Sequence, residues 1–106
     1  MQWKLPKPIE SYIAAANSHD AEATAACFTR DAVVRDEGRD WAAIREWSEE
    51  VSRKYHPTVT VLGIAEAGGK TIVTGRVSGT FPGSPIDLRH IFTLEGEKIA
   101  RLEIVP

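Results

Sequence analysis

The stretch KTIVTGRVSGTFPGSPIDLRHIFTLEGEKIARLEIV, residues 70–105, decides the fold class of this chain. It is rich in Val, Ile, Thr and Phe, which favour strands. Pro-Gly-Ser-Pro at 82–85 and Gly96 divide it, because glycine and proline supply the backbone angles of turns. With one more strand before the two glycines at 68–69, four strands are predicted, at 58–66, 70–81, 86–95 and 98–105. Short turns between them indicate an antiparallel sheet that follows sequence order.

Alternation along these strands predicts which side chains share a face, because successive side chains point to opposite sides of a sheet. The largely apolar face holds Val73, Val77, Phe81, Leu88, His90, Phe92, Leu94, Leu102 and Ile104. The mixed, charged face holds Thr74, Arg76, Asp87, Arg89, Ile91, Arg101 and Glu103. We expect the apolar face to form a concavity beneath the helices and the mixed face to point outward.

The first half of the sequence has the apolar spacing of helices. One helix is predicted to begin at the prolines 6 and 8 and to run to Asn17. A second, at 21–28, follows the capping residues Ser-His-Asp at 18–20. Helices followed by strands are typical of α+β folds, in which the helices cover one face of an antiparallel sheet.

A third helix is predicted after a short strand-like run at 32–36 and a turn at 37–39. Asp40 is a suitable N-cap, and Pro57 ends the helix. The apolar stripe of this helix consists of Trp41, Ile44, Trp47, Val51 and Tyr55. The rest of its surface is charged and is expected to face solvent.

Composition limits the class of protein. The 106 residues show no break in composition, so a single domain over 1–106 is predicted. A net charge of -2 argues against a nucleic-acid partner. No apolar run is long enough to cross a membrane, and the start, MQWKLP at 1–6, lacks the apolar region of a signal peptide, so we expect a cytoplasmic protein.

No cofactor or metal is expected from the motifs. The sequence has no phosphate-binding glycine motif and no Gly-x-Ser-x-Gly elbow. The single cysteine, Cys27, can form no internal disulfide, and the three histidines are scattered without metal-ligand spacing. A buried, inert thiol is the simplest interpretation of Cys27.

Four segments, together with the order of elements, carry a family resemblance: AANSHD at 15–20, FTRDAVV at 28–34, AIREW at 43–47 and FTLEGEKI at 92–99. The chain resembles the NTF2-like superfamily and, within it, the SnoaL-like group. The resemblance implies a cone-shaped fold in which three N-terminal helices pack on a curved antiparallel sheet. It also implies an apolar pocket and homodimers formed through the outer face of the sheet. The family includes ketosteroid isomerases, polyketide cyclases, epoxide hydrolases, dehydratases and proteins that only bind, so it implies no single reaction.

Asp36 and His90 are the candidate catalytic residues. Asp36 shares a strand face with Val34, and a carboxylate at the rim of an apolar cavity has a raised pKa that suits a general base. A turn residue that bonds to nearby backbone N–H groups is the alternative. His90 is the polar side chain on an otherwise apolar face, where it could donate to a ligand oxygen or move a proton; the alternative is a structural histidine.

Candidate ligand-binding residues come from both layers. Tyr12, Trp47 and Tyr55 could reach the pocket from the first and third helices, and the tyrosine hydroxyls could donate hydrogen bonds to a ligand. The alternative is that these aromatic side chains are simply core. The predicted apolar wall of the pocket consists of Val34, Val77, Leu88 and Phe92.

Two functions follow from these residues. In the first, the chain binds a mostly apolar small molecule, cyclic or open-chain, and performs acid–base chemistry of the isomerase, cyclase or dehydratase type. Asp36 is then the base, and His90 and Tyr12 are donors. In the second, the pocket is filled, and a non-catalytic homodimer forms through the outer face. The two are separated by whether Asp36 and His90 converge on an open cavity.

Overall fold

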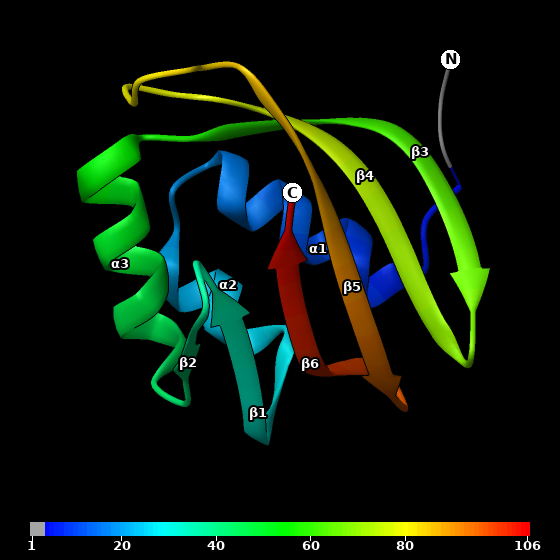
Figure 1. Ribbon diagram of the computed structural model, residues 1–106. Helices are drawn as coiled ribbons and strands as arrows, with labels where there is room; N and C mark the ends of the chain where they lie inside the picture. Colours follow the sequence, from blue (N-terminus) through cyan, green and yellow to red (C-terminus); the bar gives the residue numbers. More distant parts are fainter. Residues whose placement is uncertain (1–3) are drawn as a thin grey trace.

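A computed structural model describes residues 4–106 and confirms the α+β class (Figure 1). Met1, Gln2 and Trp3, where we expect no signal peptide, lie outside the described residues. Within 4–106 the helices are α1 (Lys7–Asn17), α2 (Ala21–Ala26) and α3 (Ile44–Tyr55). The strands are β1 (Phe28–Asp36), β2 (Arg39–Trp41), β3 (Thr58–Ala67), β4 (Lys70–Ser78), β5 (Ile86–Glu95) and β6 (Lys98–Val105).

The six strands form one curved sheet in the order β2-β1-β6-β5-β4-β3. The β3 to β6 run is antiparallel and follows sequence order, as predicted. β1, for which the sequence patterns predict no partner, pairs in parallel with β6. A parallel pair needs a long crossover, and the segment from α3 through β5 provides it before β6 returns beside β1.

The boundary between α2 and β1 also differs from the prediction. The helix ends at Ala26 rather than 28, and β1 begins at Phe28 rather than 32. Phe28 pairs with Ile99, whose N–H donates to the Cys27 carbonyl at 2.8 Å. The Phe28 ring is buried edge-on against Tyr12 at 5.8 Å between centroids. Pairing with a strand 70 residues away therefore overrides the local helical pattern.

A hairpin replaces the predicted start of the third helix. Residues 39–41 form β2, which pairs with the end of β1, and α3 begins at Ile44 after the cap residue Ala43. Asp40 is consequently not an N-cap. Its carboxylate instead accepts from Arg35 across the hairpin at 2.9 Å.

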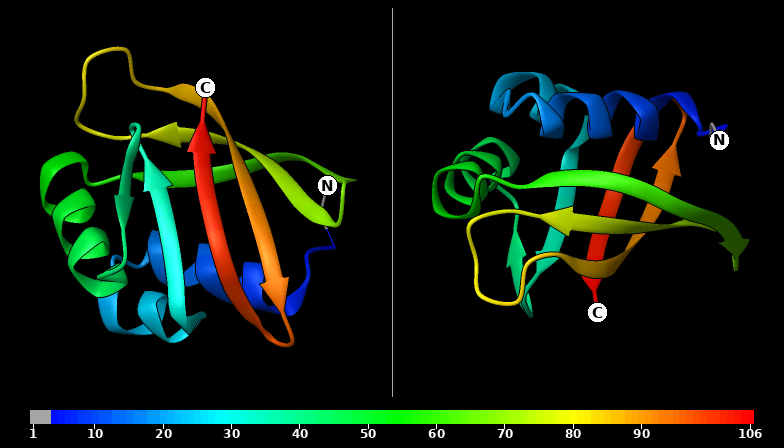
Figure 2. Two further views of the ribbon diagram at one scale, coloured as in Figure 1. Left: turned by 60° about the horizontal axis from the view of Figure 1, so that its bottom comes forward. Right: turned by 90° about the horizontal axis from the view of Figure 1, so that it is seen from above.

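The alternation along the strands identifies the concave face correctly. Val73, His90, Phe92 and Leu102 are all no more than 5% exposed, and the three helices lie on this side of the sheet (Figure 2). One irregularity interrupts the alternation along β6. The pairing of β5 with β6 skips Ala100, and Ile99 is therefore buried in the core as well. None of the helices formed by residues 4–106 lies on the opposite face.

Gly79 lies in the loop after β4, where the backbone packs closely against the end of α3. A Cβ at this position would lie 2.4 Å from the Tyr55 carbonyl oxygen, which accepts from the Thr80 N–H at 2.8 Å. We expect Gly79→Ala to lower the free energy of unfolding by about 1–3 kcal/mol, because backbone must move. Gly63→Ala is the matched control, since a Cβ there meets nothing within 4 Å. Urea unfolding measures both, and equal effects of the two substitutions would refute this account.

Candidate functional site

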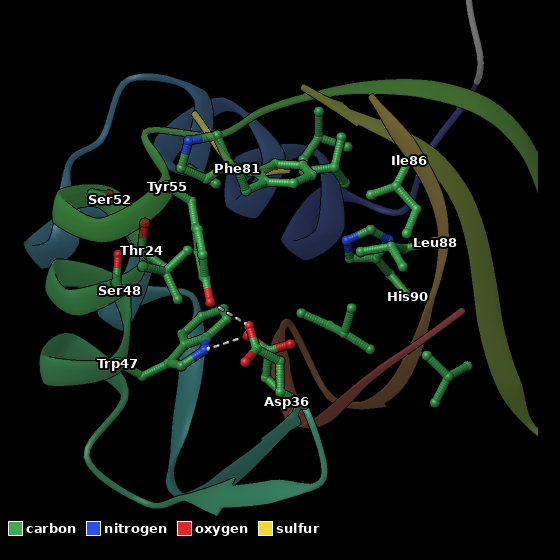
Figure 3. A pocket seen from close by; sticks show the side chains of 18 of the residues that line it. Thr24, Asp36, Trp47, Ser48, Ser52, Tyr55, Phe81, Ile86, Leu88 and His90 are labelled. Atoms are coloured by element: carbon green, nitrogen blue, oxygen red, sulfur yellow. Dashed lines mark hydrogen bonds between the residues drawn. The ribbon is translucent and has the colours of Figure 1, made fainter. Parts of the chain in front are cut away.

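A cavity of about 540 Å³ lies between the helices and the concave face of the sheet. Side chains from all three helices line it, together with side chains from β1, β3, β4 and β5, the loop after β4 and the end of β6 (Figure 3). Most of the lining is apolar. The polar groups that approach it from the sheet and from α1 are Asp36, His90 and Tyr12.

Asp36 is the last residue of β1, where alternation turns it toward the cavity. Its Oδ2 accepts a hydrogen bond from Trp47 Nε1 at 3.1 Å (Figure 3). Burial raises the pKa of the Asp36 carboxyl; the Trp47 hydrogen bond opposes the rise, and the charge of Glu37 adds to it. The neighbouring cation, Arg35, pairs with Asp40 instead. Asp36 is thus a partly buried carboxyl group, and none of the described side chains that line the cavity is a cation that could neutralise it.

His90 lies on β5 opposite Val73, and its ring packs over Gly75. The side chain is 5% exposed, and Nδ1 has no hydrogen-bond partner within the described part of the chain. Burial lowers the pKa of His90 to about 4, although the carbonyls of Val73 and Leu88 oppose the change. The imidazole is therefore neutral at pH 7, and it can donate or accept a hydrogen bond without carrying charge.

Tyr12 reaches the cavity from α1. Its ring is 4% exposed and packs edge-on against Phe28 and Phe92, at 5.8 and 5.7 Å between centroids. Burial, and then the charge of Asp36, raise the pKa of the Tyr12 hydroxyl. Tyr12 therefore keeps its proton and is available as a hydrogen-bond donor.

Most of the predicted site residues come together on this cavity. Those that line it are Tyr12, Asp36, Trp47, Tyr55, Val77, Leu88 and His90. Val34 and Phe92 do not reach it. Both are 0% exposed and belong to the core beside the cavity, where Phe92 contacts Tyr12.

The structure adds cavity residues that the sequence patterns did not single out. Glu37 is one of them: its Oε1 accepts from the Tyr55 hydroxyl at 2.9 Å, and its φ of 54° places it in the left-handed region. Ser48 and Ser52 line the α3 wall beside the aromatic side chains. The two serines could have been predicted to line the cavity, because they lie near Trp47 and Tyr55 on the same helix. Glu37 could not, because its position depends on the β1–β2 hairpin, which was not predicted.

Residues 4–106 contain no cluster of three or more His, Cys, Asp or Glu side chains that could hold a metal ion. Over the same range, no helix has the length and apolar character needed to cross a membrane.

Three helices on one face of a curved, six-stranded sheet, with an apolar cavity between them, define an NTF2-like α+β domain. The model of the SnoaL-like domain matches residues 9–102, nearly the whole chain. The chain belongs to the SnoaL-like domain family. None of the curated protein sequences matches it.

Solved structures agree with this assignment. A proposed polyketide cyclase from Sinorhizobium meliloti is 35% identical, with a TM-score of 0.88 and 94% of each chain covered. A protein from Catenulispora acidiphila with a ketosteroid isomerase-like fold, in complex with trimethylamine, is 18% identical (TM-score 0.84; 97% of this chain and 87% of that one). SalBIII, an epoxide hydrolase/cyclase-like enzyme of pyran ring formation in salinomycin, is 23% identical (TM-score 0.76; 92% and 86%). The last two likenesses concern the fold alone.

Proposed function

We propose that this protein binds a small, mostly apolar molecule in the cavity and removes a proton from it with Asp36 as general base. The observation that carries the proposal is a carboxyl group of raised pKa in an apolar cavity of about 540 Å³. A carboxylate that loses its hydration shell becomes a stronger base, and its pKa approaches the working pH.

His90 and Tyr12 complete the proposed chemistry. Removal of a proton next to a carbonyl places negative charge on the carbonyl oxygen, and a hydrogen-bond donor at that oxygen stabilises the transition state. Tyr12 is such a donor because it keeps its proton, and neutral His90 is another because one ring nitrogen carries hydrogen. Isomerisation, cyclisation and dehydration all can begin with this step.

The likeness to a proposed polyketide cyclase at 35% identity supports chemistry of this type. The test uses 5-nitrobenzisoxazole, a neutral aromatic probe that opens to a coloured phenolate when a base removes its ring C–H proton. The N–O bond breaks as the proton leaves, so no other reactant is needed. Turnover that depends on Asp36 supports the proposal, and turnover indifferent to Asp36→Asn contradicts it.

We also propose a homodimer that forms through the outer face of the sheet. On this face Ile72 and Ile91 are adjacent on β4 and β5, only partly buried, and uncovered by any described helix. Native mass spectrometry at micromolar concentration should give twice the 11.7 kDa mass of the chain. Ile91→Glu should shift the mass to the monomer, because two like charges would meet at a two-fold contact. Ala14→Glu, on the exposed side of α1, is the control; a monomeric unmodified protein would refute the dimer.

A further inference from the structure

The charged side chains among the described residues that line the cavity are all negative. They are Asp36 and Glu37, and no Lys or Arg is among the described residues that line it. The arginines that flank them in sequence are engaged elsewhere. Arg35 pairs with Asp40 at 2.9 Å, and the Arg39 guanidinium lies 4.1 Å from the centroid of the Trp41 ring.

Aromatic side chains stand beside the two carboxylates. Trp47 donates to Asp36 (Figure 3), and Tyr55 donates to Glu37. The Tyr55 ring in turn packs edge-on against Phe81 at 5.8 Å between centroids. The faces of aromatic rings attract cations, most strongly where water is excluded. Carboxylates and aromatic walls together form a site of the kind that binds organic cations.

We infer that the cavity takes an apolar molecule bearing a protonated amine, which pairs with Asp36 between the aromatic walls, and that it rejects carboxylates. The inference rests on the part of the proposed function that places an apolar molecule in this cavity. Because the ammonium group occupies the Asp36 carboxylate, such an amine is a ligand that competes with a substrate of the base, not itself a molecule that Asp36 deprotonates at carbon. The pairing is a charge-assisted hydrogen bond, about twice as strong as one between neutral groups.

An anionic ligand has no equivalent partner among the described residues that line the cavity. Lys54 lies outside that lining, with its Nζ 5.2 Å from the centroid of the Tyr55 ring. The anion would lie near Asp36 and Glu37, and burial of an unpaired charge is costly. His90 does not offset that cost, because its imidazole is neutral at pH 7. The hydroxyl of Tyr12 offers a hydrogen bond but no charge.

Three probes of nearly one shape test this inference: 2-naphthylmethylamine, 2-naphthylmethanol and 2-naphthoate. Isothermal titration calorimetry of the unmodified protein at pH 7 gives the dissociation constant of each. We expect the amine to bind about tenfold more tightly than the alcohol. The carboxylate should bind at least tenfold more weakly than the alcohol.

Substitutions of single residues show which side chain causes the preference for the amine over the alcohol. Asp36→Asn should bring amine and alcohol to within about twofold of each other, and Glu37→Gln should reduce the preference in part. Asp31→Asn is the matched control, because Asp31 lies on the same strand but is exposed outside the cavity.

The outcomes separate the two proposals. Equal binding of the three probes, tightest binding of the carboxylate, or an amine preference that survives in Asp36→Asn overturns the inference and leaves cavity binding intact. Failure of all three probes to bind contradicts the proposed function itself, and the inference falls with it.

Discussion

Asp36→Asn should slow the opening of 5-nitrobenzisoxazole by about 10²- to 10⁴-fold, the usual contribution of a positioned general base. The amide keeps the shape of the carboxyl group and can still accept from Trp47, but it cannot take a proton. Release of the phenolate is followed by its absorbance. In the unmodified protein the rate should rise with pH until Asp36 is ionised, above the usual carboxyl range because burial raises its pKa.

Two controls accompany this substitution. Val77→Phe places a larger side chain on the cavity wall and should suppress the rate while leaving the Asp36 carboxyl in place. Asp31→Asn removes an exposed carboxylate of β1 and should have no effect. A rate retained in Asp36→Asn, or lost equally in Asp31→Asn, would exclude Asp36 as the base.

Loss of activity in Asp36→Asn should not arise from unfolding. The folded state raises the pKa of Asp36, so it favours the neutral form and loses stability as the pH rises and the carboxyl ionises. An amide at this position cannot ionise. We therefore expect the free energy of unfolding of the variant to exceed that of the unmodified protein at pH 8, as measured in urea.

His90 should make the protein acid-labile. Its pKa is lowered from 6.5 to about 4 in the folded state, so below pH 6.5 the unfolded chain binds a proton that the folded chain does not. Stability is therefore complete above pH 6.5 and falls as the pH approaches 4. At 1.36 kcal/mol per pKa unit, the loss amounts to about 3 kcal/mol.

His90→Gln should remove this loss, because an amide does not titrate. Urea unfolding of the variant and the unmodified protein at pH 7.5, 5.5 and 4 measures the difference in slope. The raised pKa of Asp36 acts in the opposite direction, but it is present in both proteins and largely cancels in the comparison. Parallel stability curves for the two proteins would show that His90 is not the group responsible.

The type of most elements was predictable, because hydrophobic periodicity is a local property. The bounds of β5 and β6 agree with the predicted 86–95 and 98–105, and α1 ends at Asn17 as expected. Alternation also placed His90 on the concave face and put Asp36 on the cavity side of β1. These results depend only on which neighbouring side chains are apolar.

The cavity lining was less predictable. Alternation shows which way a side chain points, but not whether the space in front of it is filled. Val34 and Phe92 point inward and are packed against the core, whereas Leu88 points inward and meets open volume. That difference is set by where α1 and α3 lie above the sheet.

By itself, then, the sequence determined the α+β class, the helices, the antiparallel β3–β6 run and the face from which Asp36 and His90 line the cavity. Only the tertiary structure decided the parallel pairing of β1 with β6, the β1–β2 hairpin that brings Glu37 to Tyr55, and the skipped residue that buries Ile99. The physical reason is the distance along the chain over which each feature is determined. Periodicity is fixed within a few residues, whereas strand partners, bulges and empty volume are fixed by contacts between segments far apart in the chain.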